Sequence, residues 1–240
     1  MDWSQYNQGQ VDALHADNVI LVSPDDVPLS DTEGLARSKL AAHTLPGSLH
    51  RAFSVFFVTP DRKVLLQRRA LSKITFPGLW ANTCCSHPLY LPSGEAETVF
   101  EAARRRLVQE LGLSASFCEG LDMTRLCRLR YRAEAPKDAL GRVWVEHEVD
   151  HVLFCLVDAD QVDAAMHLNK EEVSHTTWAS VDDVAELRQQ GALSHWFMYI
   201  WDALSLQDRL ANTQGDGSPL TPSGIHDMSL GGDAAIVGCD

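Results

Sequence analysis

Two glutamates one residue apart form the acidic pattern in this sequence that most directly suggests chemistry. Glu146 and Glu148 lie in the run VWVEHEVD at residues 143–150. Alternate side chains of a β-strand point to the same face, so the two carboxylates would lie side by side. Two like charges at that distance repel each other unless a cation or a shared proton relieves them. The spacing is typical of a metal site, and it is equally typical of an acidic strand surface that faces solvent.

A second segment with reactive side chains is the loop FPGLWANTCCSHP at residues 76–88. It contains Cys85 and His87. The pairs Pro-Gly and His-Pro bracket it, which predicts an irregular loop of the kind that often carries functional residues. Taken singly, Cys85 would be a small buried apolar side chain and His87 an ordinary loop residue.

The run RRLVQELG at residues 105–112 resembles the end of a Nudix box, whose consensus there is REUxEExGU. In Nudix hydrolases, these glutamates hold the magnesium that activates water for attack on a diphosphate. Here Arg106 and Gln109 replace two of the glutamates, and Glu110 remains. This loss removes most of the anionic ligands that a hydrolytic metal cluster needs. The resemblance therefore implies a Nudix-like fold and argues against pyrophosphohydrolysis.

The run NTCCSHP at residues 82–88 resembles the N-[ST]-x-C-x-H-P core of the active-site loop in type I isopentenyl diphosphate isomerases. The resemblance implies that Cys85 is the catalytic cysteine and His87 a metal-ligand histidine. It also matches the glutamate pair to the E-x-E pair of that family, with Glu148 as the catalytic glutamate and Glu146 as a metal ligand.

The same resemblance implies a metal site with three histidines, because two upstream histidines match the other ligands of the family. The implied histidines are His43, His50 and His87. Together with two carboxylates they would form a six-coordinate nitrogen and oxygen site. The softness of these ligands allows Zn²⁺, Mn²⁺ or Mg²⁺.

Four basic residues match the diphosphate contacts of the family. The run QRRALSKI at residues 67–74 resembles its RRAxSK segment. The implied contacts are Lys39, Arg69, Lys73 and Arg106. An arginine suits this task because its planar guanidinium can donate two parallel hydrogen bonds to a phosphate. A Mg²⁺ that bridges the diphosphate oxygens would touch Glu110.

Two aromatic residues complete the match and imply a mechanism. Tyr131 corresponds to the tyrosine beside the catalytic glutamate, and Trp196 to the tryptophan over the hydrocarbon part of the substrate. In that family, a proton is added to the terminal methylene of isopentenyl diphosphate and another is removed from C2 on the opposite face. In the isopentenyl-to-dimethylallyl direction, the glutamate side is thought to deliver the proton and the cysteine side to remove it, and the sequence does not fix this assignment for Glu148 and Cys85. Trp196 would face the tertiary carbocation with its ring.

The elements that must position these residues mix strands with a few helices. Apolar residues recur at helical spacing over residues 95–112, and Gly112 ends that helix. A Pro-Asp pair at residues 60–61 predicts a hairpin. The predicted strands are 19–22, 51–59, 63–68, 126–132, 143–157 and 172–178, and the further predicted helices are 181–190 and 195–210. This order predicts an α/β (α+β) fold, a Nudix-like α/β/α sandwich with a mixed central sheet.

Composition limits the class of protein and its partners. The 240 residues are 45% hydrophobic, which fits one domain, expected at 18–210 between a flexible leader at 1–17 and an acidic tail at 211–240. The net charge of −13 predicts no binding to nucleic acid or to anionic membranes. The first residues resemble no signal peptide, so we expect a cytoplasmic protein with free thiols at its six cysteines.

Two alternatives to an isomerase of isoprenoid biosynthesis remain at this point. One is a Nudix hydrolase of a nucleoside diphosphate derivative, which would need the missing glutamates. The other is a non-catalytic Nudix-like binding module, which would not need a cysteine and a glutamate on opposite faces of a pocket. The sequence leaves open whether the protein is a monomer or a weak dimer.

Overall fold

The computed structural model describes residues 3, 6–30, 32, 34–135, 137–138 and 141–211 of the chain. Apart from Ala211, the tail expected at 211–240 lies outside the described residues. No helix in the described part of the chain has the length and apolar character needed to cross a bilayer.

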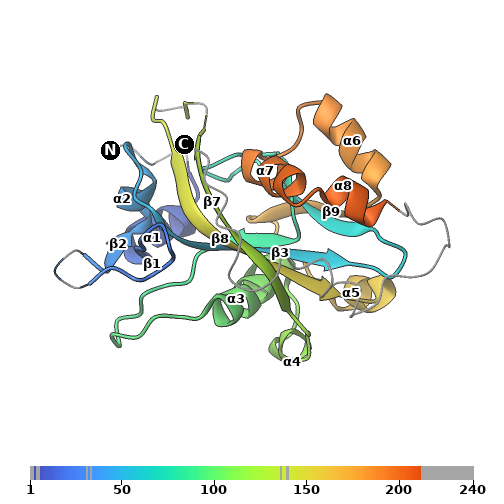
Figure 1. Ribbon diagram of the computed structural model, residues 1–240, viewed down its shortest axis with the longest axis horizontal. Helices are drawn as coiled ribbons and strands as arrows, with labels where there is room; N and C mark the ends of the chain where they lie inside the picture. Colours follow the sequence, from blue (N-terminus) through green and yellow to red (C-terminus); the bar gives the residue numbers. More distant parts are fainter. Residues whose placement is uncertain are drawn as a thin grey trace.

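A mixed sheet of seven strands forms the centre of the described structure (Figure 1). Its main order is β5-β4-β3-β8-β7, with β6 beside β3 and β9 beside β4. The long strands β3 and β8 run parallel, and the other pairs are antiparallel. The strands are β3 His50–Val58, β4 Val64–Arg69, β5 Trp80–Ala81, β6 Cys84–Ser86, β7 Thr124–Glu134, β8 Val145–Leu156 and β9 Val173–Ala179.

Helices cover both faces of this sheet, which confirms the predicted α/β/α sandwich (Figure 1). One face packs on α3 (Val99–Leu111), α4 (Ala115–Glu119) and α5 (Ala159–Ala165). The other packs on α6 (Val181–Gln189), α7 (His195–Ala203) and α8 (Leu206–Leu210). The central strand β3 is thus buried from two sides, as its nearly continuous apolar sequence requires.

Strand alternation decides which core each side chain enters. In β3, Phe53 and Val55 enter the core under α3, whereas Phe56 and Val58 enter the core under α7. In β8, Phe154 lies on the α7 face and Leu153 on the α3 face. Even-numbered residues of both central strands therefore point to the α7 face.

The helix predicted at 95–112 begins later than the sequence suggested. Thr98 caps α3, because its hydroxyl accepts from the Glu101 backbone N–H while the Glu101 carboxylate accepts from the Thr98 N–H. This capping box starts the helix after Glu95 and Glu97, which lie inside the predicted range. Gly112 ends α3 as predicted, with φ +66°, where an added Cβ would lie 1.9 Å from the His167 carbonyl oxygen.

Two further segments differ from the sequence prediction. Where a flexible leader was expected at 1–17, the structure has α1 (Gln8–Ala16), which buries Val11 and Leu14. The single helix expected at 195–210 is divided into α7 and α8 at Ser205, whose φ of +48° interrupts the helical backbone. Beside α1 lie β1 (Asn18–Ile20), β2 (Ala36–Ser38) and α2 (Lys39–His43), at one end of the molecule in Figure 1.

Candidate active site

A cavity of about 140 Å³ lies at the end of the sheet where α1 and α2 pack, and it is lined by residues of the α7 face together with Phe53, Arg106 and Glu110 from the α3 side. Residues that line it include Lys39, His43, Arg69, Lys73, Cys85, His87, Arg106, Glu110, Tyr131, Glu146, Glu148, Glu172 and Trp196. The site residues predicted from the sequence, apart from His50, thus meet in one place.

Sheet register explains why these side chains share a face. Glu148 pairs with His50 on one neighbouring strand and with Tyr131 on the other. Cys85 pairs with Ser54, which lies on the same face of β3 as His50. Directly opposed residues point to the same side of a sheet. The side chains of His50, Tyr131, Glu148 and Cys85 therefore all point to the α7 face of the sheet.

The three predicted histidines gather around Glu148. One ligand atom from each of His43, His50, His87 and Glu148 lies within 4.8 Å of the others, and all four residues are buried. Nε2 of His87 lies 2.8 Å and Nε2 of His50 lies 3.6 Å from Glu148 Oε1. These are the nitrogen and oxygen ligands that a divalent transition metal takes.

Backbone carbonyls orient two of these imidazoles. Nδ1 of His43 lies 2.7 Å from the Lys39 carbonyl, and Nδ1 of His50 lies 2.7 Å from the Ser48 carbonyl. Each Nδ1 must carry a proton to donate there, so in the neutral imidazole each Nε2 presents a lone pair to the cluster. His50 Nε2 is buried without a hydrogen-bond partner among the described residues. This unpaired buried atom fits a metal ligand.

Glu146 lies at the edge of the cluster. Its Oε2 is 3.2 Å from His43 Nε2, and it points to the same face as Glu148, as the spacing predicted. Both carboxylates are buried, so the alternative of an acidic surface facing solvent is wrong. The compact group of mutually close ligand atoms, however, contains Glu148 and not Glu146.

Charge and burial set the proton states of the cluster. Burial, with His50 and Lys39 nearby, lowers the pKa of His87 well below its usual value, so this imidazole is neutral. Burial raises the pKa of Glu148, but His50, followed by Glu146 and Tyr131, outweighs it and lowers that pKa below its usual value. The Tyr131 hydroxyl donates a hydrogen bond to Glu148 Oε2. Neutral imidazole and ionised carboxylate are the forms that bind metals.

Cys85 is half-buried in β6 and lines the cavity beside the cluster. Burial raises the pKa of its thiol to about 12, which the Arg69 guanidinium only partly counteracts. The thiol therefore keeps its proton at neutral pH. Cys84 points to the opposite, α3 face of the sheet, so the two adjacent cysteines occupy separate environments.

Trp196 forms an aromatic wall of the cavity. Its indole N–H donates to Asn82 Oδ1 at 3.1 Å, and its ring packs edge-on against Phe76 with centroids 5.0 Å apart. Phe76 has a φ of +49°, which a bulky residue rarely adopts and which turns its ring toward the indole. The Arg69 guanidinium carbon lies 5.4 Å from the indole centroid.

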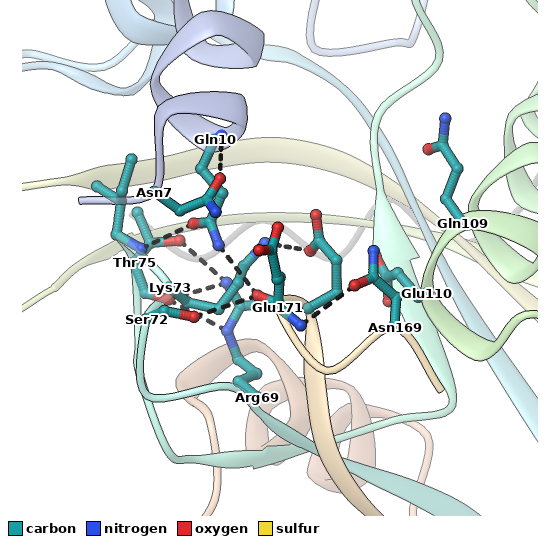
Figure 2. A network of polar contacts seen from close by, with 12 residues as sticks. Asn7, Gln10, Arg69, Ser72, Lys73, Thr75, Gln109, Glu110, Asn169 and Glu171 are labelled. Atoms are coloured by element: carbon teal, nitrogen blue, oxygen red, sulfur yellow. Dashed lines mark hydrogen bonds and ion pairs between the residues drawn. The ribbon is translucent and has the colours of Figure 1, made fainter. Parts of the chain in front are cut away.

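The four predicted cations, Lys39, Arg69, Lys73 and Arg106, also line the cavity, and we call this part its cationic end. Arg69 donates to the carbonyl and hydroxyl oxygens of Thr75, and Figure 2 shows the loop between Arg69 and Thr75 folded back on itself. Arg106 pairs with Glu110 on α3 and with Glu172. Gln109 is exposed, accepts a hydrogen bond from Arg106 Nη1 at 3.1 Å and lies away from Arg69 and Lys73 in Figure 2. Of the two positions where the Nudix box has lost a glutamate, Arg106 lines the cavity and Gln109 does not.

Two contributors to this end were not predicted from the sequence. Gln10 on α1 donates to the Glu171 carbonyl at 3.1 Å and accepts from the Ile74 N–H at 3.2 Å. Glu172 binds Lys73 and Arg106. The only sequence signal for Glu172 is its place at the first position of a predicted strand, which does not distinguish it from other acidic residues.

Comparison with known proteins agrees with this geometry. The model of the NUDIX domain matches residues 48–202. The isopentenyl-diphosphate Delta-isomerase of Streptomyces griseus is 41% identical over 165 residues, covering 69% of this chain and 74% of the relative. The isopentenyl-diphosphate delta-isomerase of Phaffia rhodozyma is 37% identical over 216 residues, covering 83% and 82%. The chain belongs to the isopentenyl-diphosphate delta-isomerase family.

A solved structure supports the fold of this isomerase family member. DR0079 of Deinococcus radiodurans superposes with a TM-score of 0.54 at 19% identity, covering 81% of this chain and 99% of that one. A likeness at this identity concerns the fold alone. The Nudix fold and family predicted from the sequence are confirmed, and the chain is an isomerase by family membership.

Proposed function

We propose that the chain interconverts isopentenyl diphosphate and dimethylallyl diphosphate, with Cys85 and Glu148 as the proton-transferring residues. The observation that carries this proposal is the meeting of three groups in one small cavity. A buried histidine and glutamate cluster, a protonated thiol and four cations lie together there. The substrate combines a five-carbon alkene with a diphosphate, and these groups match its two ends.

The cationic end would bind the diphosphate. Lys39, Arg69, Lys73 and Arg106 provide charge complementary to the phosphoryl oxygens. A Mg²⁺ carried with the substrate would find Glu110, which is buried and accepts a hydrogen bond from Gln67 at 2.9 Å. Binding at this end orients the alkene without taking part in the proton transfers.

The metal site would be formed by His43, His50, His87 and Glu148, with Glu146 as a further ligand. Hard and borderline divalent ions, namely Mn²⁺, Zn²⁺ and Mg²⁺, fit this mixed set. A bound cation would supply electrostatic stabilisation of the ionised carboxylate.

The reaction requires one proton to be added to the terminal methylene carbon and one to be removed from C2. Atoms balance, because the product is an isomer and the protein exchanges one proton for another. Glu148, hydrogen-bonded to Tyr131, and the Cys85 thiol are the groups in the cavity that would exchange these protons. When the direction of the reaction reverses, the donor and the acceptor exchange roles.

Trp196 would stabilise the carbocation between the two proton transfers. An aromatic face attracts a desolvated cation by about 2 kcal/mol or more. Trp196 lines the cavity, and the bond from its N–H to Asn82 fixes the plane of the ring there, with the Arg69 guanidinium carbon 5.4 Å from the ring centroid. Residues of α1 and α7 line the cavity, and exclusion of water by the bound substrate would keep the cation from being trapped as an alcohol.

Incubation with isopentenyl diphosphate and Mg²⁺, followed by product analysis, tests the proposal. We expect dimethylallyl diphosphate without release of inorganic pyrophosphate or phosphate. A panel of nucleoside diphosphate derivatives serves as the comparison, since a Nudix hydrolase would cleave one of them. Hydrolysis of a nucleotide without isomerisation would refute the proposed function.

A further inference from the structure

Glu172 places a negative charge in the middle of the cationic end of the cavity. Its Oε2 lies 2.5 Å from Lys73 Nζ and 3.3 Å from Arg106 Nη2. Lys73 follows β4, Arg106 lies on α3, and Glu172 directly precedes β9. One carboxylate oxygen therefore joins cations that come from two different parts of the fold.

All three side chains are largely removed from water. Those of Lys73 and Arg106 are each 14% exposed, and that of Glu172 is 17% exposed. Charges this buried need partners of opposite sign. Arg106 has a second carboxylate in Glu110, whereas Glu172 is the ion-pair partner that Lys73 has among the described residues. Lys73 thus depends on Glu172 for its orientation.

The backbone around Glu172 is fixed relative to the loop that carries Lys73. The Glu172 carbonyl accepts from Ala70 N–H at 3.0 Å, and the Glu172 N–H donates to Asn169 at 2.9 Å. The neighbouring Glu171 carbonyl accepts from Ser72 and from Gln10, and Figure 2 shows these residues converging. The carboxylate therefore stands on a rigid base rather than on a free loop.

A carboxylate in an anion site can either compete with the anion or hold the cations in place. The ammonium has three N–H donors and the guanidinium has five. Glu172 occupies one donor of Lys73 and leaves two for a ligand. Arg106 also donates to Glu110 from Nε and Nη2 and to Gln109 from Nη1, so Lys73 provides most of the donors that remain. The Glu172 backbone is fixed by hydrogen bonds, and its buried carboxylate contacts both Lys73 and Arg106. These observations indicate that the carboxylate holds the two cations in place.

We propose that Glu172 is a positioning residue that orients Lys73 and Arg106 so that their remaining donors bind the substrate diphosphate. This inference rests on the proposed function, because it assigns Glu172 a task in the same site. Glu172 does not touch the reacting carbons in this account. Its loss should therefore affect binding of the diphosphate and spare the proton transfers at Cys85 and Glu148.

The test compares Glu172→Gln with Glu171→Gln, a matched control that removes the same charge from the exposed neighbouring side chain. Calorimetry with inorganic pyrophosphate and Mg²⁺ measures the Kd, and steady-state kinetics measures kcat and KM. We expect Glu172→Gln to raise the Kd and the KM by about 10–100-fold with kcat within about 3-fold. Glu171→Gln should match the wild type, and Glu172→Asp should restore part of the affinity.

Unchanged or tighter pyrophosphate binding by Glu172→Gln would overturn the inference, because it would show that the carboxylate merely competes with the anion. An equal loss in Glu171→Gln would also overturn it, since the effect would then be one of net charge. If Glu172→Gln does not fold, Glu172→Asp decides, with a KM rise at constant kcat expected and wild-type values contradicting. Failure of the wild type to isomerise would count against the proposed function alone, because pyrophosphate binding still tests Glu172.

Discussion

Nε2 of His87 lies 2.8 Å from Oε1 of Glu148, and the second oxygen of the same carboxylate accepts a hydrogen bond from the Tyr131 hydroxyl. Glu148 therefore belongs both to the histidine cluster and to the wall of the cavity. A residue in both places can couple metal binding to proton transfer. This double role makes Glu148 the most sensitive position of the site.

Glu148→Gln should abolish most of the activity. The amide keeps the shape of the side chain but cannot exchange the proton or supply the negative ligand. We expect kcat to fall by about 10²–10⁴-fold, with KM for isopentenyl diphosphate nearly unchanged, measured by steady-state kinetics. Tyr131→Phe, which removes the hydrogen bond and keeps the ring, should lose less. Wild-type turnover by Glu148→Gln would contradict the assignment.

Removal of bound metal should both inactivate and destabilise the protein. Dialysis against a chelator would leave four buried ligand groups without their cation. At a metal concentration of 100 times the Kd, the lost stabilisation is about 2.7 kcal/mol, visible as a lower Tm. Adding back Zn²⁺, Mn²⁺ or Mg²⁺ separately, with elemental analysis, would identify the ion. Full activity without measurable bound metal would contradict the proposed site.

Substrate affinity should decrease above pH 8. Burial and the neighbouring Arg69 lower the pKa of Lys73 to about 8, although Glu172 opposes this. Because a lysine is charged below its pKa, the cation is present at pH 7 and is lost as pH rises through 8. KM for isopentenyl diphosphate should rise over this range. Lys73→Arg keeps its charge there and should flatten the profile, so an unchanged profile in that variant would contradict the assignment to Lys73.

Asn82 should be as important for stability as for activity. Its amide group donates to the carbonyls of Val55 and Cys84, while its oxygen accepts from Trp196. Asn82→Asp would remove both of these donated hydrogen bonds, at about 1–3 kcal/mol for each carbonyl that finds no other donor. Urea unfolding should show this loss, and kcat should fall because both Trp196 and β6 are displaced.

The exposed Asn18→Asp is the control for the same chemical change. It should leave both the unfolding free energy and kcat at wild-type values. A fully stable and active Asn82→Asp variant would show that the hydrogen bonds of this amide position neither Trp196 nor the strand that carries Cys85.

The sequence predicted the parts of the site that lie in short local patterns. The spacing of Glu146 and Glu148 predicted that they share one face of a strand. The pattern of the loop around Cys85 predicted that Cys85 and His87 lie in the same site. The sequence did not reveal Glu172, because its partner Lys73 is 99 residues away in the chain and only folding brings them together. The role of α1 was missed for a similar reason, since its two buried residues become informative only when packed against the sheet.

Isomerisation in D₂O, compared between the wild type and Cys85→Ala, tests the central claim most directly. Purified protein with Mg²⁺ and isopentenyl diphosphate would be followed by NMR. The account predicts deuterium-labelled dimethylallyl diphosphate from the wild type, because the proton added to the alkene comes from a group that exchanges with solvent, and nearly none from Cys85→Ala. Unlabelled product would contradict the addition of a proton that exchanges with solvent. Undiminished turnover by Cys85→Ala would remove the cysteine from the mechanism. Unchanged substrate with the metal-loaded wild type would contradict the isomerase activity itself.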